Sequence, residues 1–206
     1  LGIDIAFEES YQSYLNHFNQ IKDRGLKYVD LTISDDHKGL IKAQQEVFPN
    51  TPHQRCICHF MRNVLSCVPY KEKAKLADYL KQIFNSPTRQ MAVTVAKMIA
   101  RKYQTSYHKV SEMLQGELEF TLTYLNYSKH HRRKIRTTNL IEGVINKDLK
   151  QRSRVVGIFP NQESCLRYAS LRLMEIDEEW QTGRRYLKIN KEDQFLQEDD
   201  PLLEEI

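Results

Sequence analysis

Strands and helices are expected to alternate along the first 66 residues of this chain, and the strand signals then stop. The expected strands are residues 1–7, 26–34 and 53–60, which are short runs with apolar side chains. Apolar residues at helical spacing follow each of these runs. Because this alternation is typical of parallel strands packed against helices, the sequence predicts an α/β layer.

The next stretch, from Lys71 to about Tyr127, carries helical patterns alone. Pro87 and a polar stretch at residues 104–108 separate its pieces. We therefore expect an all-helical insertion. The elements expected after it are a helix near residues 138–151, a turn at VVGIFPN and a helix over about residues 162–180.

Charge is distributed unevenly, although the formal net charge is only +4. Residues 129–154 hold nine Lys and Arg against Glu142 and Asp148. Such a block suits the phosphate backbone of a nucleic acid, and a solvated helix face is the alternative. Residues 192–206 hold seven Asp and Glu but no Lys or Arg, which predicts a disordered acidic tail.

Composition narrows the class of protein further. No apolar run approaches the roughly 18 residues that a membrane-spanning helix needs. The N-terminal sequence LGIDIAFEES lacks the pattern of a signal peptide. The four Cys residues are too few and too unevenly spaced for a disulfide framework. We therefore expect a cytoplasmic protein without a membrane segment.

Asp35 ends the strand expected at residues 26–34 and lies on the same side of it as Leu31 and Ile33. A carboxylate at the carboxyl end of a buried strand stands where α/β sheets place ligands and catalytic groups. The alternative is that Asp35 or Asp36 caps the helix that follows, a role that suits Asp36 better.

Glu142 is one of two acids within the basic block. If residues 139–150 form an α-helix, one broad stripe of that helix is apolar: Leu140, Ile141, Val144, Ile145 and Leu149. Asn139, Asn146 and Lys150 then share the other face with Glu142. This environment favours a carboxylate aimed at a metal or a phosphate, and a solvated glutamate is the alternative. Asp148 falls toward the apolar side, where the sequence offers no role for it.

The sequence QRCICHF brings Cys56, Cys58 and His59 together. Structural zinc needs four ligands, and the further candidates, His53 and Cys67, are not spaced as in a common zinc finger. A buried Cys beside a hydrogen-bonded His is the interpretation that the spacing favours, with a zinc site as the alternative.

Four separated stretches, taken together, resemble the mutator-type DDE transposases of bacterial insertion sequences. They are ISDDHKGL, HQRCICHFMRNVL, RTTNLIEGVINKDLKQRSRVVGIFPN and EEWQTGRRYL. The resemblance runs from LGIDIAFEES to about Leu187, and it is specific because the motifs keep their order. It implies a ribonuclease H-like core of the α/β class, incomplete and missing its first strands, with an all-helical insertion before the last catalytic acid.

The resemblance assigns roles to individual residues. Asp35 matches the second acid of the catalytic triad, in the pattern S-D-x-H-x-G-L. Glu142 matches the final acid, in T-T-N-x-x-E, and Asn139 accompanies it. Cys56 and His59 match the family's C-x-x-H signature. Both acids are expected to be metal ligands, in a site that holds two Mg²⁺ or Mn²⁺ ions in the complete family.

The implied function is transposition, in which DNA strands are cut at the ends of an insertion sequence and transferred into target DNA. The implied partners are double-stranded DNA and further copies of the chain, in the bacterial cytoplasm at the nucleoid. The side chains expected to contact the DNA backbone are Arg132, Arg133, Lys134, Arg136, Lys150, Arg152 and Arg154.

One departure from the family pattern concerns its first Asp, which lies upstream of the L-G-I-D segment with which this chain begins. Asp4 also lies on an expected strand, but it stands where the family has a later one. We therefore expect a truncated transposase that does not cut or join DNA by itself. Two alternatives stay open: a non-catalytic DNA-binding or interaction fragment that modulates full-length transposase, and a zinc-dependent module built on Cys56, Cys58 and His59.

The sequence predicts four parts. They are the first part of the catalytic core at residues 1–70, the helical insertion at 71–128, the last part of the core with the Glu-bearing helix and the basic face at 129–187, and the acidic tail at 188–206.

Overall fold

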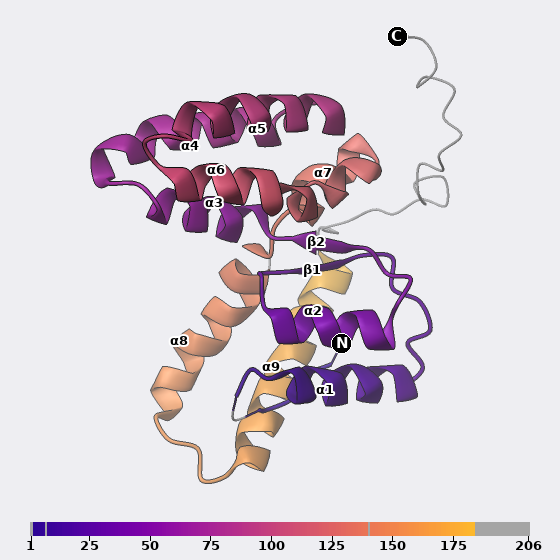
Figure 1. Cartoon of the computed structure of the whole chain (residues 1–206). Helices are drawn as coiled ribbons and strands as arrows, with labels where there is room; N and C mark the ends of the chain where they lie inside the picture. Colours follow the sequence, from indigo (N-terminus) through magenta and orange to yellow (C-terminus); the bar gives the residue numbers. More distant parts are fainter. Residues whose placement is uncertain (1, 7, 140, 184–206) are drawn as a thin grey trace. The chain divides into compact units, whose positions relative to one another are not determined.

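The computed structural model describes residues 2–6, 8–139 and 141–183 of the chain. These residues fall into two compact units, and each is described by itself. Unit 1 contains the described residues of Leu1–Leu31, His37–Thr51 and Thr138–Lys188, and unit 2 contains those of Thr32–Asp36 and Pro52–Thr137. Figure 1 labels the elements in chain order. The expected acidic tail lies outside the described residues, and the four expected parts stay a prediction.

Unit 2 holds a small parallel sheet. Strand β1 (Thr32–Ser34) pairs with strand β2 (His53–Arg55), so that Thr32 faces His53 and Ser34 faces Arg55. The expected parallel pairing is confirmed, and helices with a small sheet agree with the α/β class. Both strands are shorter than expected, because strand structure extends only as far as a hydrogen-bonded neighbour does. For the same reason the alternating sequence at residues 2–6 forms no strand in the part of the chain that the structure describes.

Helices make up the rest of unit 2, as the sequence predicts for Lys71 to Tyr127. They are α3 (Ile57–Ser66), α4 (Tyr70–Phe84), α5 (Arg89–Tyr103), α6 (His108–Gly116), the 3₁₀ turns η1 (Leu118–Thr121) and η2 (Thr123–Asn126), and α7 (Lys129–Ile135). The first four lie side by side (Figure 1). Their apolar stripes supply a core of fully buried side chains that includes Phe60, Leu76, Leu80, Ile83 and Val110.

Gln54 fastens the helical part of unit 2 to the sheet. Its side chain is fully buried on β2. Its Nε2 donates to the carbonyl of Thr121 at 2.8 Å, and its Oε1 accepts from the backbone N–H of Tyr124 at 2.7 Å. The Thr123 hydroxyl donates to the carbonyl of His53 at 2.8 Å. Because buried amides and carbonyls are satisfied in this way, strand β2 is held firmly against the helical part.

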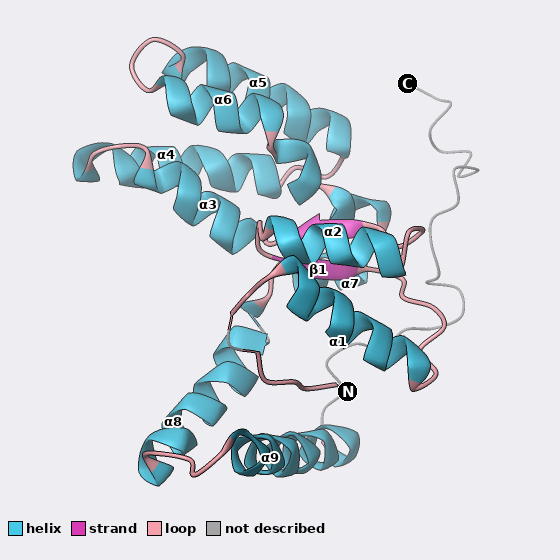
Figure 2. Ribbon diagram, turned by 60° about the horizontal axis from the view of Figure 1, so that its bottom comes forward, coloured by secondary structure: helices cyan, strands magenta, loops and turns pink. Residues whose placement is uncertain are grey.

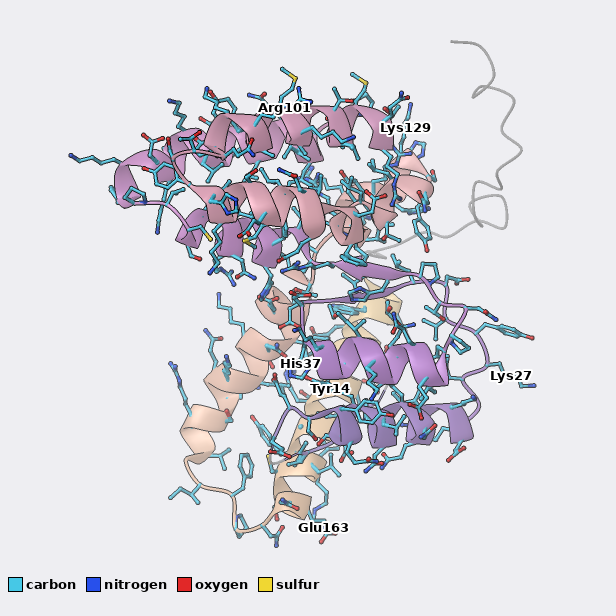
Figure 3. The ribbon with its side chains drawn as sticks, in the orientation of Figure 1. Tyr14, Lys27, His37, Arg101, Lys129 and Glu163 are labelled. Carbon is cyan, nitrogen blue, oxygen red and sulfur yellow. The ribbon has the colours of Figure 1, made fainter. Side chains whose placement is uncertain are left out.

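Unit 1 is helical. It contains α1 (Tyr11–Asp23), α2 (Lys38–Val47), the π-helix η3 (Ile141–Asn146), α8 (Lys147–Val156) and α9 (Gln162–Thr182). Helices α1 and α2 pack closely, since a Cβ on Gly39 would lie 2.8 Å from the backbone N of Tyr11. The rings of Tyr14 and His37 meet at 5.2 Å between centroids (Figure 3). Glycine at position 39 is therefore required by the approach of the two helices.

The last part of unit 1 forms a helical hairpin, in which α8 and α9 are joined by a turn (Figure 2). Gly157 adopts a φ of 78° in this turn, a value that favours glycine. The turn and the last helix are confirmed. The single α-helix expected near residues 138–151 is wrong in its first part, where the chain forms a π-helix. None of the helices in the described ranges is long and apolar enough to cross a membrane.

Candidate active site

Asp35 follows the last residue of β1, and its side chain is exposed. The cap of α2 is the side chain of His37, whose Nδ1 accepts from the backbone N–H of Leu40 at 3.2 Å. The alternative that Asp35 or Asp36 caps this helix is therefore wrong. An exposed carboxylate at the carboxyl end of a parallel strand is available for a ligand, which keeps the functional interpretation of Asp35.

Asp36 is held by a buried arginine. Arg55 Nη2 lies 3.0 Å from Asp36 Oδ2, and Arg55 Nη1 lies 2.6 Å from Glu117 Oε2. The Arg55 side chain is only 2 % exposed, and its guanidinium lies 5.1 Å from the centroid of the Phe60 ring. Because Arg55 is buried and bound to both carboxylates, it holds the backbone at Asp36 and at Glu117 in place.

Ser34 holds the backbone of Asp35 from the other side. Its hydroxyl donates to the carbonyl of Asp35 at 2.8 Å and lies 2.8 Å from His53 Nε2. Because the hydroxyl proton is used on Asp35, His53 Nε2 donates to the hydroxyl oxygen. Burial lowers the pKa of His53, against the opposing effect of Asp36. Ser34, neutral His53 and Arg55 thus form a frame around the carboxyl end of β1.

Sequence reasoning missed this frame of Ser34, His53 and Arg55. The available signal was an arginine and a histidine within a short strand directly before Cys56. Cys56 itself is fully buried, as expected, and its N–H donates to the carbonyl of Ser34 at 2.7 Å. Cys58 and His59 are half-buried in the first turn of α3. Over the described residues, no three His, Cys, Asp or Glu side chains gather so as to hold a metal ion.

Glu142 lies in the π-helix η3 and is half-buried. Its carboxylate accepts a hydrogen bond from the hydroxyl of Thr138, and its N–H donates to the Thr138 carbonyl at 3.1 Å. A π-helix closes its hydrogen bonds between residues five apart, so the expected wheel of 3.6 residues per turn does not hold here. Val144, expected on the buried stripe, is in fact exposed. Leu140, of the same stripe, lies outside the described residues.

Asp35 belongs to unit 2, whereas Asn139 and Glu142 belong to unit 1. Each carboxylate is therefore placed by its own unit. The expected meeting of Asp35 and Glu142 around a shared ion stays a prediction.

The basic residues of α7 differ in what their side chains do. Arg132 donates to three carbonyls, of Leu125, Tyr127 and Pro87, at 2.8 to 2.9 Å. Burial lowers the pKa of Arg132. Arg136, just after the helix, donates to the carbonyl of Phe84 at 3.2 Å.

These contacts give Arg132 and Arg136 a role in the fold of unit 2. Lys134 is half-buried on the same helix. Arg133 is exposed, so its guanidinium faces solvent.

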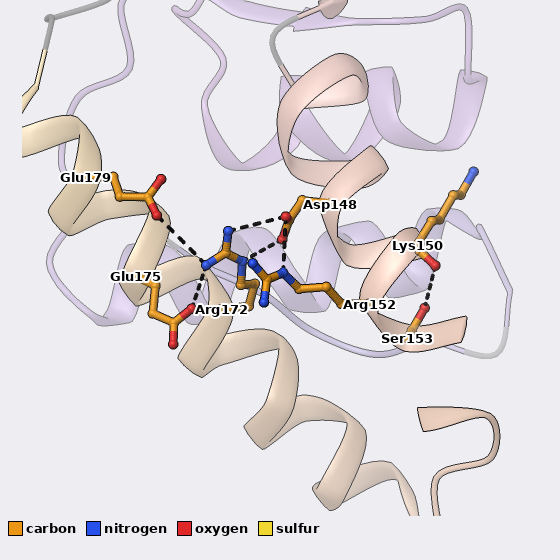
Figure 4. A network of polar contacts seen from close by, with 7 residues as sticks. All are labelled: Asp148, Lys150, Arg152, Ser153, Arg172, Glu175 and Glu179. Atoms are coloured by element: carbon orange, nitrogen blue, oxygen red, sulfur yellow. Dashed lines mark hydrogen bonds and ion pairs between the residues drawn. The ribbon is translucent and has the colours of Figure 1, made fainter. Parts of the chain in front are cut away.

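Asp148 connects the two helices of the hairpin. Arg172 Nε and Nη2 on α9 lie 2.5 and 3.2 Å from the Asp148 carboxylate, and Arg152 Nε lies 3.3 Å from it (Figure 4). These arginines, Arg172 first, hold the pKa of Asp148 below its usual range. Glu175 and Glu179 flank Arg172 at 2.5 and 4.0 Å. This ion-pair network supplies the role for Asp148 that the sequence did not reveal.

The chain is similar throughout its described length to known transposases. The model of the family "Transposase, Mutator family" matches residues 1–183. The transposase for insertion sequence element IS406 of Burkholderia multivorans is 37 % identical over 191 residues, which are 92 % of this chain and 49 % of that protein. The transposase for IS256 in transposon Tn4001 of Staphylococcus aureus is 32 % identical over 194 residues, 93 % of this chain and 49 % of that protein.

The chain thus spans about half the length of the curated relatives that it matches. The family match covers both units, including the strand end with Asp35 and the π-helix with Glu142. On this evidence the chain belongs to the Mutator family of transposases.

Proposed function

We propose that this chain is the part of an insertion-sequence transposase that supplies Asp35 and Glu142 to a ribonuclease H-like catalytic core. The observation that carries the proposal is the state of Asp35. Its carboxylate is exposed, it caps no helix, and its backbone is fixed by Ser34 while Arg55 fixes the next residue. A carboxylate on a rigid strand end is prepared for a ligand before the ligand arrives.

The two carboxylates suit Mg²⁺ or Mn²⁺. These hard cations prefer oxygen ligands and bind through few carboxylates together with water and phosphate oxygens. The hydrogen bond from Thr138 is compatible with metal binding, because a carboxylate has about four lone-pair sites. When bound, two such ions supply activation of a water or 3′-hydroxyl nucleophile and stabilisation of the leaving oxygen. Asp35 and Glu142 bind and orient the ions. The frame around Asp35 keeps its carboxylate from moving.

Exposed cations supply the affinity for double-stranded DNA. Arg133, Lys150 and Arg154 are exposed, and phosphate contacts of this kind give salt-dependent binding without base selection. The proposed setting is a complex of several copies on the DNA of the bacterial nucleoid. The same exposed cations also favour a second candidate, a DNA-binding or interaction fragment that modulates transposase without catalysis. Metal binding distinguishes the two candidates.

The test is a calorimetric titration of the chain with Mn²⁺. We expect Asp35→Asn and Glu142→Gln each to weaken Mn²⁺ binding by about tenfold or more, since each replaces an anionic carboxylate by a neutral amide that keeps only one oxygen. Asp23→Asn, which neutralises an exposed carboxylate at the end of α1, is the matched control and should bind as the parent does. If the parent and the three variants bound Mn²⁺ with equal affinity, the proposed metal site would be wrong and the non-catalytic candidate would stand.

A further inference from the structure

The end of α8 and the turn that follows it expose apolar side chains next to one another. Val155 is 89 % exposed and Ile158 is 90 % exposed, and Val156 between them is also exposed. We call these three residues the apolar tip. Single exposed apolar residues are common on protein surfaces, but a contiguous group marks an interaction site.

The apolar tip is held by a rigid base. Asp148 and Arg172 join the two helices, and the rings of Phe159 and Tyr168 lie 5.6 Å apart. The side chain of Asn161 caps α9 by accepting from the N–H of Ser164 at 2.8 Å. Because contacts hold the residues on both sides of the turn, ordering the apolar side chains on binding costs less conformational entropy.

Charge around the apolar tip indicates what kind of partner it meets. Lys150, Arg152 and Arg154 are exposed on α8 just before it, and Arg152 also pairs with Asp148. Two acids of the same hairpin are already paired: Asp148 is paired with arginines (Figure 4), and exposed Glu163, in the first turn of α9, is paired with an arginine of that helix at 3.0 Å. The apolar tip therefore stands at the end of a cationic helix.

A second apolar pair on the same hairpin has the opposite surroundings. Leu171 and Met174 on α9 are exposed as well, but Glu175 and Glu178 are their neighbours along the helix. A polyanion is repelled by that surface and attracted by the apolar tip. The exposed cation nearest to this pair, Arg167, is already paired with an acid of the same helix at 3.0 Å, so the apolar tip has the more cationic surroundings of the two.

We propose that the apolar tip is a wedge for double-stranded DNA, in which Val155 and Ile158 enter a base step while Arg154 and Lys150 contact the flanking phosphates. Aliphatic side chains inserted between base pairs unstack them and kink the duplex, and nearby cations balance the phosphate charge. The stacked bases are apolar and the phosphates on either side of them are anionic. The tip has the complementary arrangement, with aliphatic side chains next to cations. The inference deepens the proposed function and rests on its claim that the chain binds DNA.

The test uses duplexes that carry the fluorescent base 2-aminopurine at successive positions, since its emission rises when it is unstacked. The intact chain should raise the emission at one or a few flexible pyrimidine–purine steps. The double variant Val155→Ser/Ile158→Ser should lose this rise, while its affinity changes by less than about tenfold because phosphate contacts dominate binding. Leu171→Ser, which changes another exposed aliphatic residue of the same hairpin, is the matched control and should keep the rise.

A separate variant tests the cationic part of the inference. Arg154→Gln should reduce the slope of log affinity against log salt by about 0.9, as expected for one lost phosphate contact. Circular dichroism and thermal unfolding confirm that each variant folds as the parent does.

The outcomes separate this inference from the proposed function. DNA binding with the full salt dependence but no rise in emission would overturn the wedge and leave the proposed function intact. A chain that binds no DNA would overturn both. If the double variant changed the sedimentation mass of the DNA-free chain and left the emission rise unaffected, the apolar tip would belong to an interface between copies, and the wedge would be wrong.

Discussion

Arg55 is the buried charge that holds the carboxyl end of β1 in place. Its guanidinium is buried, whereas its partners Asp36 and Glu117 are partly exposed. An ion pair of this kind adds little net stability when both partners are replaced together, but loss of one partner leaves a buried charge without its counter-charge. The arginine therefore makes the geometry of this strand end depend on both acids.

Two glutamates at the start of η1, two residues apart, give a matched test of this dependence. Glu117→Gln should lower the free energy of unfolding by about 2 kcal/mol, because buried Arg55 loses a charged hydrogen-bond partner. Glu119→Gln breaks an ion pair with Arg89, which is far more exposed, and should cost less than about 1 kcal/mol. Urea unfolding of the two variants measures the difference, and equal losses would show that Arg55 is not a buried charge in solution.

His53 should make unfolding depend on pH. Its pKa in the folded chain is below 6.5, so the unfolded chain binds more protons as pH falls past that value. The stabilisation from neutral His53 is then complete above pH 6.5 and is lost as pH falls toward the folded pKa. Asp35, Asp36 and Arg55 are the charged groups that face it.

The measurement is the free energy of unfolding between pH 7.5 and 5.5, with EDTA present. The slope from one such group is at most about 1.4 kcal/mol per pH unit. His53→Asn should have a smaller slope than the parent, and His108→Asn, which replaces an exposed histidine, should keep the parent's slope. A parent slope unchanged by His53→Asn would mean that His53 is not buried as described.

At the residue scale the sequence placed Asp35 correctly at a strand end but left its role undecided. Period-two geometry cannot show whether a helix cap is available from another residue, and His37 supplied it. Arg55 was missed because a single arginine in a strand carries no pattern. Its role depends on Glu117, which lies 62 residues away along the chain.

At the scale of single elements, the π-helix η3 is the feature that sequence reasoning got wrong. Apolar spacing predicts an α-helix near residues 138–151, but the hydrogen-bonding register is set by local packing and not by the apolar pattern. Insertions of this kind are frequent at functional sites. In η3 the change of register accompanies the contact between Thr138 and Glu142.

This contact makes Thr138 a positioning residue for Glu142. Thr138→Val removes the hydroxyl and keeps the side-chain volume, so Mn²⁺ binding should weaken by about tenfold while unfolding changes little. Thr137→Val, the same change one residue earlier, is the control and should bind Mn²⁺ as the parent does. Thr138→Ser should restore binding, because the hydroxyl returns, and failure of that rescue would assign Thr138 a purely structural role.

The strands were predicted to be longer than they are in the structure. Residues 26–34 carry strand character, but β1 begins at Thr32, where β2 offers a hydrogen-bonding neighbour. The helices between Tyr70 and Gly116 were predictable because each carries its own apolar stripe and stop signal. Local structure that needs only its own residues follows from sequence, whereas strand length depends on partners.

At the scale of the whole molecule, the order of the motifs was enough to identify the family, and the family match over residues 1–183 confirms it. The division into two units was not predictable, because Asp35 and Glu142 are assigned to different units by contacts between distant parts of the chain. The central claim is that these two carboxylates share a divalent ion. It concerns the molecule as a whole and needs a measurement that reports on both positions at once.

Iron-directed cleavage is that measurement. Fe²⁺ can replace Mg²⁺ at oxygen sites, and with ascorbate and peroxide it cuts the backbone next to where it binds, so that mass spectrometry of the fragments locates the site. We predict cuts near both Asp35 and Glu142 that Mg²⁺ suppresses together and that either Asp35→Asn or Glu142→Gln removes at both positions. Cuts near only one of them, or cuts at one position that survive loss of the other carboxylate, would contradict a shared ion.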